Sequence, residues 1–415
     1  MADYEEEFEQ EDTSRAAVRR RLMERTRETG VNMGDPAFLE REKLKRRDRR
    51  RDILVGFALI TVFILFGLFY FRNYSYTTYS MDAESAMGAL PQTVVRELQH
   101  GNVIIGGDTI TCMERGKVIW TTSVELKKPV IAVNGDFFAV CDTGGYHVYV
   151  CDTTGILCTL KVSRVIYGMD ISESGVVAVV TESDDAAYIS WFDRYGSRIP
   201  VEVKAVLSAT GIPVHISISP DSQKLMVLYY STANGIGESR MVLYDFEKGR
   251  EDDSYIIEND QSFYESGTYL VDGKFLDNEH FCAVGTNLAK FYSYDQKKGE
   301  VTDQTFEYDA AVRSVLFTPS AMCLVQRGED GSVCRVLDET GSEKVQFAVP
   351  EEYQLAAVNR ESLAFLNASD LTVFNLSGRK RYEGTLVDQP VSFAFSGKRS
   401  LLFNTGSLIE EITLK

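Results

Sequence analysis

The sequence predicts an all-β propeller of seven or eight blades that follows a single transmembrane helix. Three observations lead to this fold class. A turn that runs from Asp or Asn to Gly recurs along the chain, a second turn followed by an apolar strand recurs in step with it, and one uncharged stretch lies near the N-terminus. The 23 Phe and 21 Tyr residues also favour strands over helices.

The first repeated element is a hairpin whose turn begins with Asp or Asn and closes with Gly. An Asx side chain can accept a hydrogen bond from the backbone two residues on, and Gly tolerates the positive φ that closes such a turn. The steps between successive turns are 41, 52, 50, 43 and 37 residues. The leading residues are Asp152, Asp193, Asp245, Asp295, Asp338 and Asn375.

The second repeated element is a short turn followed by an apolar strand, as in "ISPDSQKLMVL" and "FTPSAMCLV". Two series with a common period predict units of three or four antiparallel strands, which are propeller blades. The first unit lacks an obvious innermost strand, the last lacks an outermost one, and the stretch around Pro91 to His100 has a helical period. Ring closure could combine these two incomplete units into one composite blade, so the sequence allows either seven or eight blades. The units begin near residues 103, 128, 164, 211, 268, 310, 352 and 389.

Residues Ile53 to Phe71 contain no charge over 19 positions, enough for a helix to cross a bilayer. Arg41 to Arg51 holds eight basic residues, whereas the nine residues after Phe71 hold only Arg72. The positive-inside rule then predicts an uncleaved, single-pass anchor in the cell membrane, with the N-terminus in the cytoplasm and the large domain outside. Before the span, a candidate helix covers Ser14 to Thr29, and Asp35-Pro36 opens a second, basic helix.

The predicted domains are a charged cytoplasmic tail (1–52), the transmembrane helix (53–71), a linker (72–102) and the propeller (103–415). The tail has 14 basic and 14 acidic residues, so the remaining 30 basic and 47 acidic residues account for the whole net charge of −17. Nucleic-acid binding by the large domain is disfavoured, because its acidic surface would face a polyanion.

The "SPDSQKL"-like turns and the hairpin series resemble the WD40-like and quinoprotein-like propeller superfamily, and "ITCMERGKVIW" is similar to a quinoprotein-type blade edge. With its anchor, the chain resembles bacterial single-pass membrane proteins that carry an extracytoplasmic propeller of unassigned function. The quinoprotein resemblance would imply a cofactor held by tryptophans. Only Trp120 and Trp191 are present, so no cofactor is expected.

Recognisable catalytic and metal-binding motifs are missing from the sequence. It has no Gly-x-Ser-x-Gly elbow, and its four histidines, His100, His147, His215 and His280, are too dispersed for a zinc-ligand spacing. The many carboxylates favour no particular pair. The sequence therefore assigns no catalytic, cofactor-binding or metal-binding residue.

Two other features suggest specific roles. The loop Glu251 to Gly267 interleaves six carboxylates with Tyr255, Phe263 and Tyr264, which is typical either of a protein-docking edge or of a solvated connection. Cys151 and Cys158 flank a turn centred on Thr154-Gly155. This pairing would place the two thiols across neighbouring strands, either as a disulfide or as reduced thiols, with a metal or redox site as a third reading.

The leading functional hypothesis is a membrane-tethered extracytoplasmic propeller that binds a protein or an envelope component without catalysis. The alternative is an envelope-acting enzyme for glycans or peptides, with acidic residues converging at the propeller axis. A structural role in envelope assembly is a third reading that rests on fold alone.

Overall fold

The structure is a computed structural model. It describes residues 36–85, 93–232, 237–246, 263–266, 268–328 and 331–415, together with Arg20, Met23 and Gly235. The chain divides into two compact units, Met1–Tyr74 and Ser75–Lys415. The helix predicted over Ser14 to Thr29 lies outside the described residues, apart from Arg20 and Met23, which are helical.

The first unit contains one long helix, α2 (Pro36–Asn73). Its start at Pro36 agrees with the sequence, since the fixed φ of proline suits the first helical turn. Large apolar side chains between Ile53 and Phe66 are exposed along it, for example Phe63 at 78%. Within the described part of the chain, no helix combines the length and the apolarity that crossing a membrane requires. The span over 53–71 stays a prediction.

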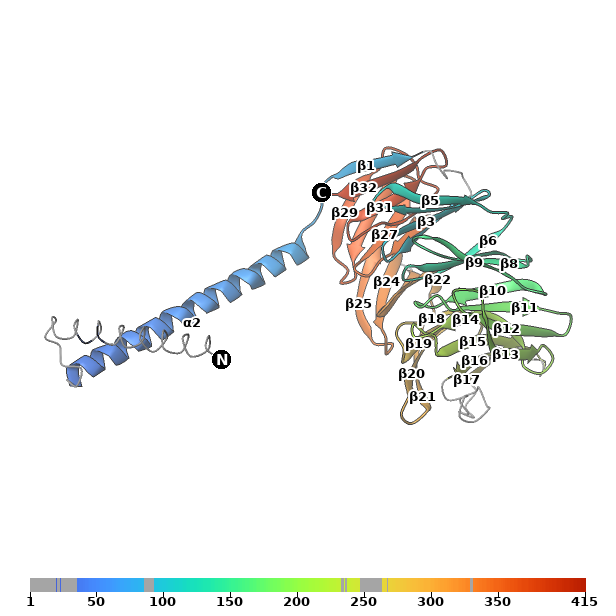
Figure 1. The fold of residues 1–415 in the computed structure, drawn as a ribbon, viewed down its shortest axis with the longest axis horizontal. Helices are drawn as coiled ribbons and strands as arrows, with labels where there is room; N and C mark the ends of the chain where they lie inside the picture. The colour runs from blue at the N-terminus through green and yellow to red at the C-terminus, as the bar shows by residue number, and fades with distance from the viewer. Residues whose placement is uncertain are drawn as a thin grey trace, which may run out of the picture. The chain divides into compact units, whose positions relative to one another are not determined.

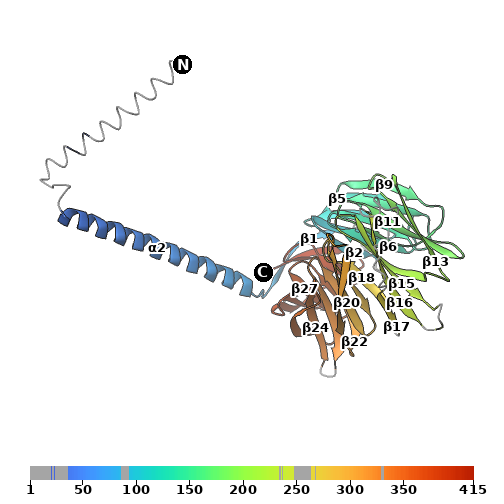
Figure 2. The same cartoon turned by 90° about the horizontal axis from the view of Figure 1, so that it is seen from below.

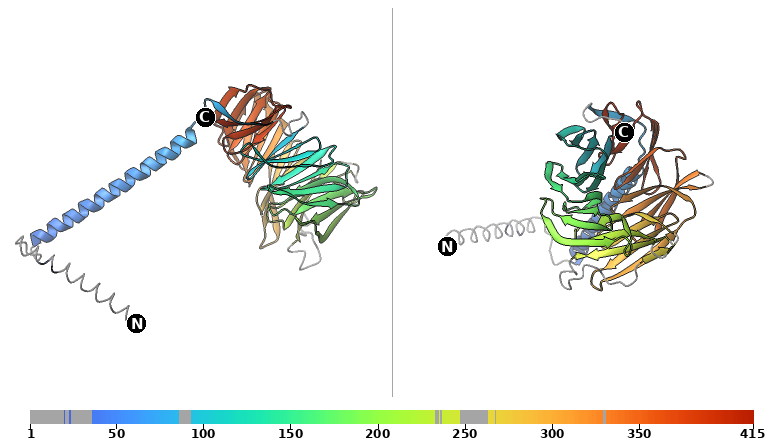
Figure 3. Two further views of the ribbon diagram at one scale, coloured as in Figure 1. Left: turned by 45° about the horizontal axis from the view of Figure 1, so that its top comes forward. Right: turned by 90° about the vertical axis from the view of Figure 1, so that its right-hand side faces the viewer.

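The described residues of the second unit form eight four-stranded antiparallel sheets, so the fold is an eight-bladed β-propeller. The sheets follow one another around a ring in chain order, and the red last blade lies beside the teal first blade (Figures 1 and 3). We number them blade 1 (β2–β5) to blade 8 (β30–β32 with β1). The first strand of each blade is innermost, because the first strands of neighbouring blades contact one another around the axis.

The strand bounds follow the position of each strand within its blade. The first strands are β2 (Val94–Leu98), β6 (Pro129–Asn134), β10 (Val165–Ile171), β14 (Ile212–Ile218), β18 (Leu270–Phe275), β22 (Ala311–Thr318), β26 (Leu355–Val358) and β30 (Ser392–Phe395). The second strands are β3 (Gly101–Gly106), β7 (Phe137–Asp142), β11 (Val177–Glu182), β15 (Lys224–Ser231), β19 (His280–Gly285), β23 (Ala321–Gly328), β27 (Ser362–Asn367) and β31 (Ser400–Asn404).

The two outer positions complete each blade. The third strands are β4 (Thr109–Glu114), β8 (His147–Asp152), β12 (Ala186–Phe192), β16 (Glu238–Asp245), β20 (Leu288–Asp295), β24 (Gly331–Asp338), β28 (Asp370–Asn375) and β32 (Ile409–Leu414). The fourth strands are β5 (Lys117–Ser123), β9 (Gly155–Lys161), β13 (Arg198–Val206), β17 (Phe263–Ser266), β21 (Glu300–Glu307), β25 (Glu343–Val349), β29 (Lys380–Thr385) and, in blade 8, β1 (Tyr79–Ser85).

The structure differs from the predicted linker over 72–102, because β1 and β2 lie within it. β1 pairs with β32 from the opposite end of the chain and closes the ring (Figure 2). β2 is the innermost strand of blade 1, where the sequence had a helical period. Val95 and Leu98 are both buried and three residues apart, a spacing that resembles a helix although the packing is that of a strand. β2 is the innermost strand that the first unit lacked in the sequence, and β1 is the outermost strand that the last unit lacked. With both strands in place, the ring has eight complete blades.

Hydrophobic clusters hold neighbouring blades together. Among the described residues there are eight clusters, one at each interface between blades, including Val95 with Leu402 at the closure of blade 8 on blade 1. Trp120 of blade 1 stacks on Phe138 of blade 2 with 6.2 Å between ring centroids, and its Nε1 donates to the Thr153 carbonyl at 3.1 Å. The core is therefore a ring of blade interfaces rather than one central mass.

All blades begin and end on the same face of the ring. With four antiparallel strands per blade, the fourth strand finishes beside the start of the first, and a connection as short as residues 162–164 leads to the next blade. We call the face where the first strands begin the leading face. The opposite face, where the first strands end and the hairpins between third and fourth strands lie, is the trailing face.

Five of the six Asx-to-Gly turns are these trailing-face hairpins, and their predicted capping is confirmed, whereas the turn that follows Asp245 lies outside the described residues. The Oδ1 atom of Asp193 accepts hydrogen bonds from the backbone N–H of Tyr195 at 2.9 Å and of Ser197 at 2.8 Å. Asn375 accepts in the same way from Ser377 and Arg379. The side chains thus satisfy backbone donors that the tight turn would otherwise leave unpaired.

Candidate functional site

Of the alternatives for Cys151 and Cys158, the structure has two reduced thiols and no disulfide, since both cysteines are free. Asp152 pairs with Gly155, and a bulge then places Cys151 opposite Ile156, and Cys158 opposite Val150. Cys151 packs between blades 1 and 2, whereas Cys158 packs between blades 2 and 3. The two sulfur atoms therefore belong to opposite faces of one blade. The two central residues of the turn are Thr153 and Thr154, one position earlier than predicted.

The predicted docking loop is only partly described. Tyr255 lies outside the described residues. Phe263 and Tyr264 are strand residues of β17, where they pair with Met241 and Arg240 of β16. Two of the three aromatic residues thus belong to the outer strand of blade 4 rather than to a loop.

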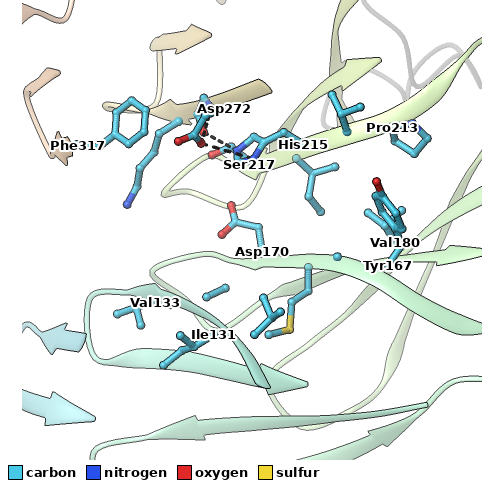
Figure 4. A pocket seen from close by; sticks show the side chains of 18 of the residues that line it. Ile131, Val133, Tyr167, Asp170, Val180, Pro213, His215, Ser217, Asp272 and Phe317 are labelled. Carbon is cyan, nitrogen blue, oxygen red and sulfur yellow. Dashed lines mark hydrogen bonds and ion pairs between the residues drawn. The ribbon is translucent and has the colours of Figure 1, made fainter. Parts of the chain in front are cut away.

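The structure reveals a site that sequence reasoning missed, a cavity of about 560 Å³ at the propeller axis. First strands of blades 1 to 6 line it, from β2 to β22. The hydrophilic side chains in its wall are Arg96, Tyr167, Asp170, His215, Ser217, Asp272 and Lys274. Figure 4 shows Asp170 directed into the cavity between Ile131 and Val133 on one side and His215 on the other. A single sequence could not show which residues of separate blades would meet here.

One layer of this cavity repeats from blade to blade. One residue near the trailing end of each first strand pairs with the second or third residue of the following strand, so these residues stand at about the same height around the axis. Each blade therefore contributes one side chain to the layer, and its charged members come from blades 1, 3 and 5. In blades 1 to 6 the layer consists of Arg96, Ala132, Asp170, Ser217, Lys274 and Leu316, of which all but Leu316 line the cavity.

Two residues of this layer fasten their blade to the next one. The Oδ2 atom of Asp170 accepts the Ile218 N–H of blade 4 at 2.8 Å, and the Ser217 hydroxyl accepts the Phe275 N–H of blade 5 at 3.2 Å. Burial raises the pKa of Asp170, while the Ile218 N–H and the charge of Lys274 act in the opposite direction. These side chains are thus partly structural.

His215 and Asp272 form a second contact between blades 4 and 5. The Nε2–H of His215 donates to the Gly273 carbonyl at 2.6 Å, which leaves Nδ1 3.6 Å from Oδ1 of Asp272. Figure 4 shows the two side chains facing each other. Asp272 also accepts its neighbour's Gly273 N–H at 2.8 Å. The carboxylates of the cavity are therefore already engaged by donors of the protein itself.

Four consecutive first strands contain a bulge at the same place near the leading face. The pairing register shifts by one residue in β10, β14, β18 and β22, and the additional residues are Tyr167, Val214, Val271 and Arg313. Bulges redirect side chains and are frequent at the rims of barrels and next to active sites. Here they surround one half of the mouth of the axial cavity.

The leading face also concentrates exposed apolar side chains. In the described part of the propeller, thirteen large apolar side chains are exposed. Ten lie near the leading ends of first strands, at the end of β13, or in leading-face turns and connections, whereas Met81, Ile119 and Tyr195 lie elsewhere. The ten are Val130, Tyr146, Val165, Tyr167, Val206, Ile212, Tyr269, Val271, Val387 and Val391. Exposed apolar side chains gathered on one face are a common feature of interaction sites.

Two of the other histidines contact carboxylates at separate places around the ring. His100 contacts Asp136 at 2.6 Å on the trailing face, and His280 contacts Asp277 at 2.8 Å in a turn. Over the residues that the structure describes, no group of three or more His, Cys, Asp or Glu side chains is placed to hold a metal ion. Among the arrangements described, the axial cavity with its apolar rim is the one best suited to be a binding site.

Solved structures share the propeller architecture at low sequence identity. The Dos1 propeller is 11% identical, with 82% of this chain and 94% of that chain covered and a TM-score of 0.50. BamB from Moraxella catarrhalis is 12% identical over 81% of this chain and 100% of its own, with a TM-score of 0.47. AztD from Citrobacter koseri is 11% identical over 72% and 87%, with a TM-score of 0.48. At these identities the similarity concerns the fold.

No curated protein matches the chain in sequence. A family model does match, over residues 72–414, and it covers β1 and β2 together with all later strands. The match therefore spans the complete ring that the structure describes. The chain belongs to this family, which is described as a family of unknown function, DUF5711.

Proposed function

We propose that the protein is a membrane-tethered, extracytoplasmic binding module whose leading face docks a protein partner. The observation behind this proposal is the concentration of exposed apolar side chains around the mouth of the axial cavity, ten of the thirteen in the described propeller. A rigid ring that presents apolar groups on one face, rimmed by polar turns, has the composition of a protein-binding surface.

The tether rests on the sequence of residues 53–71 and its flanks. Nineteen uncharged residues follow eight basic ones, so the cell membrane is the proposed location, with the propeller outside the cytoplasm. The exposed apolar side chains of α2 between Ile53 and Phe66 support a lipid environment. A reporter fused after Lys415 tests this topology, and activity of the reporter only inside the cell would contradict it.

The point where the chain enters the propeller also favours the leading face. Tyr76 N–H donates to the Arg381 carbonyl at 2.6 Å, and Thr77 N–H donates to the Lys415 carbonyl at 2.9 Å. Both acceptors lie at the trailing ends of their strands. The entering residues 76 and 77 of the second unit thus bond to the trailing face and occupy none of the leading face.

An enzyme acting at the axis is the second candidate, and the observation that favours it is the meeting of Asp170, His215 and Asp272 in one cavity. The contacts of these residues argue against it. Asp170 and Asp272 accept backbone N–H groups, and His215 donates to a backbone carbonyl. Groups used in this way position strands, so binding is the better supported function.

The test compares two double variants of the full-length protein in cells. Ile212→Ser with Val271→Ser removes two exposed apolar side chains from the leading face. Ile119→Ser with Tyr195→Ser is the matched control, since it removes two side chains of similar exposure elsewhere. After in-cell crosslinking, we expect a reproducible adduct that the leading-face variant loses and the control keeps. Equal adducts from both variants would overturn the proposal.

A further inference from the structure

We propose that the trailing face of blades 7 and 8 binds the headgroups of anionic lipids. This inference rests on the membrane tether of the proposed function, but it concerns the face opposite the one that docks a protein partner. It adds a second interaction surface, with a lipid membrane as its partner.

Positive charge gathers on one side of the trailing face. In the turns between first and second strands, every charged residue of blades 2 to 5 is acidic. These residues are Asp136, Glu173, Asp221, Asp277 and Glu279. The same turns of blades 7 and 8 instead contain Arg360, Lys398 and Arg399 and a single carboxylate, that of Glu361. The trailing face is thus acidic on one side of the ring and basic on the other.

The outer hairpin of blade 7 extends the basic side. The end of this hairpin and the start of β29 contribute Arg379, Lys380 and Arg381. Contacts between the inner turns join the two blades, since Asn359 of blade 7 donates to the Gly397 carbonyl of blade 8 at 3.1 Å, and Lys398 pairs with Glu361. We call the six basic side chains the basic patch. They are Arg360, Arg379, Lys380, Arg381, Lys398 and Arg399.

The basic patch keeps a surplus of positive charge. Three exposed carboxylates lie close to it. Glu361 pairs with Lys398, Glu383 pairs with Lys380 at 2.8 Å, and Asp82 is within electrostatic range of Arg399. Six cations and three carboxylates leave a net charge of +3, although residues 53–415 as a whole carry 30 basic and 47 acidic residues. A positive patch on an acidic domain favours a negatively charged partner surface.

The chain enters the propeller at the basic patch, and this favours a lipid surface as the partner. The Arg381 carbonyl accepts the Tyr76 N–H, and the Arg381 guanidinium lies 5.6 Å from the centre of the Tyr76 ring. Tyr76 follows Phe71, the end of the predicted span, by five residues, which extend over at most about 18 Å. A tethered propeller therefore keeps these cations within reach of headgroups. Arginine binds phosphate oxygens through two N–H groups, and lysine binds them as a point charge.

The experiment uses the full chain in nanodiscs of phosphatidylcholine alone or with about 30% phosphatidylglycerol. A benzophenone side chain replaces Ser377 or Tyr195, which occupy the same position of the Asx-to-Gly turn in blades 7 and 3. After irradiation, mass spectrometry measures the lipid adducts. We expect at least threefold more adduct from position 377 in the anionic nanodiscs, and no difference between the lipids at position 195. Equal yields from position 377 in both lipids, or the same increase at position 195, would overturn the inference.

Variants connect the lipid preference to the basic patch. Lys398→Gln with Arg399→Gln neutralises two adjacent cations of the patch. Lys297→Gln with Lys298→Gln is the matched control, since it makes the same change of charge at exposed positions of the outer turn of blade 5. In each pair one lysine has an acidic partner. The patch variant should lose the threefold preference and the control should keep it. A preference that survives in the patch variant contradicts the assignment.

A salt titration tests the same contact without any substitution. Raising the salt concentration from about 50 mM to about 500 mM shortens the range of the electrostatic attraction, so the wild type should lose its preference for the anionic nanodiscs. A preference that is unchanged by salt would overturn the inference.

The outcome is separable from that of the proposed function. Ile212→Ser with Val271→Ser should keep the lipid preference while the partner adduct is lost. A chain that does not enter nanodiscs would contradict the tether and with it this inference, whereas a chain that enters them without preferring anionic lipid would contradict this inference alone. In cells, a protein adduct from position 377 in place of a lipid adduct would assign the basic patch to an acidic protein and overturn the inference.

Discussion

The two faces of the propeller are built differently. On the trailing face, turns of neighbouring blades bond to one another through side chains, and this joins blades 1 and 2, 3 and 4, 4 and 5, and 7 and 8. The bonds are His100 to Asp136 at 2.6 Å, Ser174 to Ser222 at 2.6 Å, Asp221 to Asn278 at 3.0 Å and Asn359 to Gly397 at 3.1 Å. The leading face instead exposes ten large apolar side chains and four bulges. Bonds from turn to turn thus distinguish the trailing face. The leading face also has bonds between blades, such as that from the Ser392 hydroxyl to the Thr93 carbonyl at 2.7 Å, but it is distinguished by its exposed apolar side chains and is the face proposed to recognise a partner.

The largest expected difference between the faces comes from two glycines with the same backbone angle. Gly341 on the trailing face and Gly144 on the leading face both have φ of +84°. A Cβ at Gly341 would lie 2.6 Å from the ring of Phe291, whereas a Cβ at Gly144 would meet nothing within 4 Å. We expect Gly341→Ala to lower the free energy of unfolding by about 2–4 kcal/mol and Gly144→Ala by about 1 kcal/mol. Urea denaturation of both variants measures the difference.

Equal losses in the two glycine variants would contradict a trailing face that is packed more tightly than the leading one. A larger loss in Gly144→Ala would reverse the comparison.

A smaller loss is expected from a trailing-face cap. Asp338 accepts the N–H groups of Thr340 at 3.0 Å and Ser342 at 2.9 Å and pairs with Lys344 at 2.6 Å. Burial pushes its pKa upward, but the bonds from Lys344, Thr340 and Ser342 outweigh this and lower the pKa to about 2. Asp338→Ala should therefore lower the free energy of unfolding by about 1–2 kcal/mol at pH 7.

The same cap predicts a pH dependence with a definite sign. A lowered pKa means that the stabilisation from Asp338 is complete above the unfolded value of 3.8 and disappears as the pH falls through about 2. Denaturation of wild type and Asp338→Ala at pH 6 and pH 3 checks this. The free energies of unfolding of the two proteins should differ more at pH 6 than at pH 3. A larger difference at pH 3 would contradict the prediction.

Glu97 near the trailing end of β2 should have the opposite pH dependence. Burial raises its pKa to about 8, and the charge of Arg360 only partly opposes this. Between pH 4.5 and 8 the folded protein therefore holds a proton that the unfolded chain releases, and its stability falls as the pH rises. Melting temperatures at pH 5.5 and pH 8.5 should differ less in Glu97→Gln than in wild type. An unchanged difference would exclude Glu97 as the cause.

The smallest effect on stability is expected at the leading face. Val271 is 58% exposed in a bulge, so Val271→Ser should change the free energy of unfolding by no more than about 0.5 kcal/mol. Chemical denaturation provides the measurement. A loss above about 1.5 kcal/mol would mean that this side chain packs within the ring and is not available to a partner.

The sequence predicts the blade well where a local turn defines it. Asx residues such as Asp193 and Asn375 bond backbone groups only two and four residues on, so their pattern is visible in a short stretch. β1 and β2 are not visible in this way. The pairing of Ala83 with Glu411 depends on a strand at the far end of the chain, and "VVREL" resembles a helix until its partner strand is known.

The axial site could not be predicted for a related reason. Arg96, Asp170 and Lys274 come from three blades, and only the ring places them in one cavity. No motif joins residues that are dozens of positions apart. The cysteine pair shows the limit of local reasoning, because a bulge beside the turn places Cys158 on the face of the blade opposite to that of Cys151.

The most direct test of the account is site-specific photo-crosslinking in cells, with one benzophenone side chain placed at Val271 on the leading face or at Tyr195 on the trailing face. Both positions are well exposed, at 58% and 68%. The account predicts a discrete adduct from position 271 and none from position 195. An adduct from position 195 alone, or the same adduct from both, would contradict a leading face that recognises the partner.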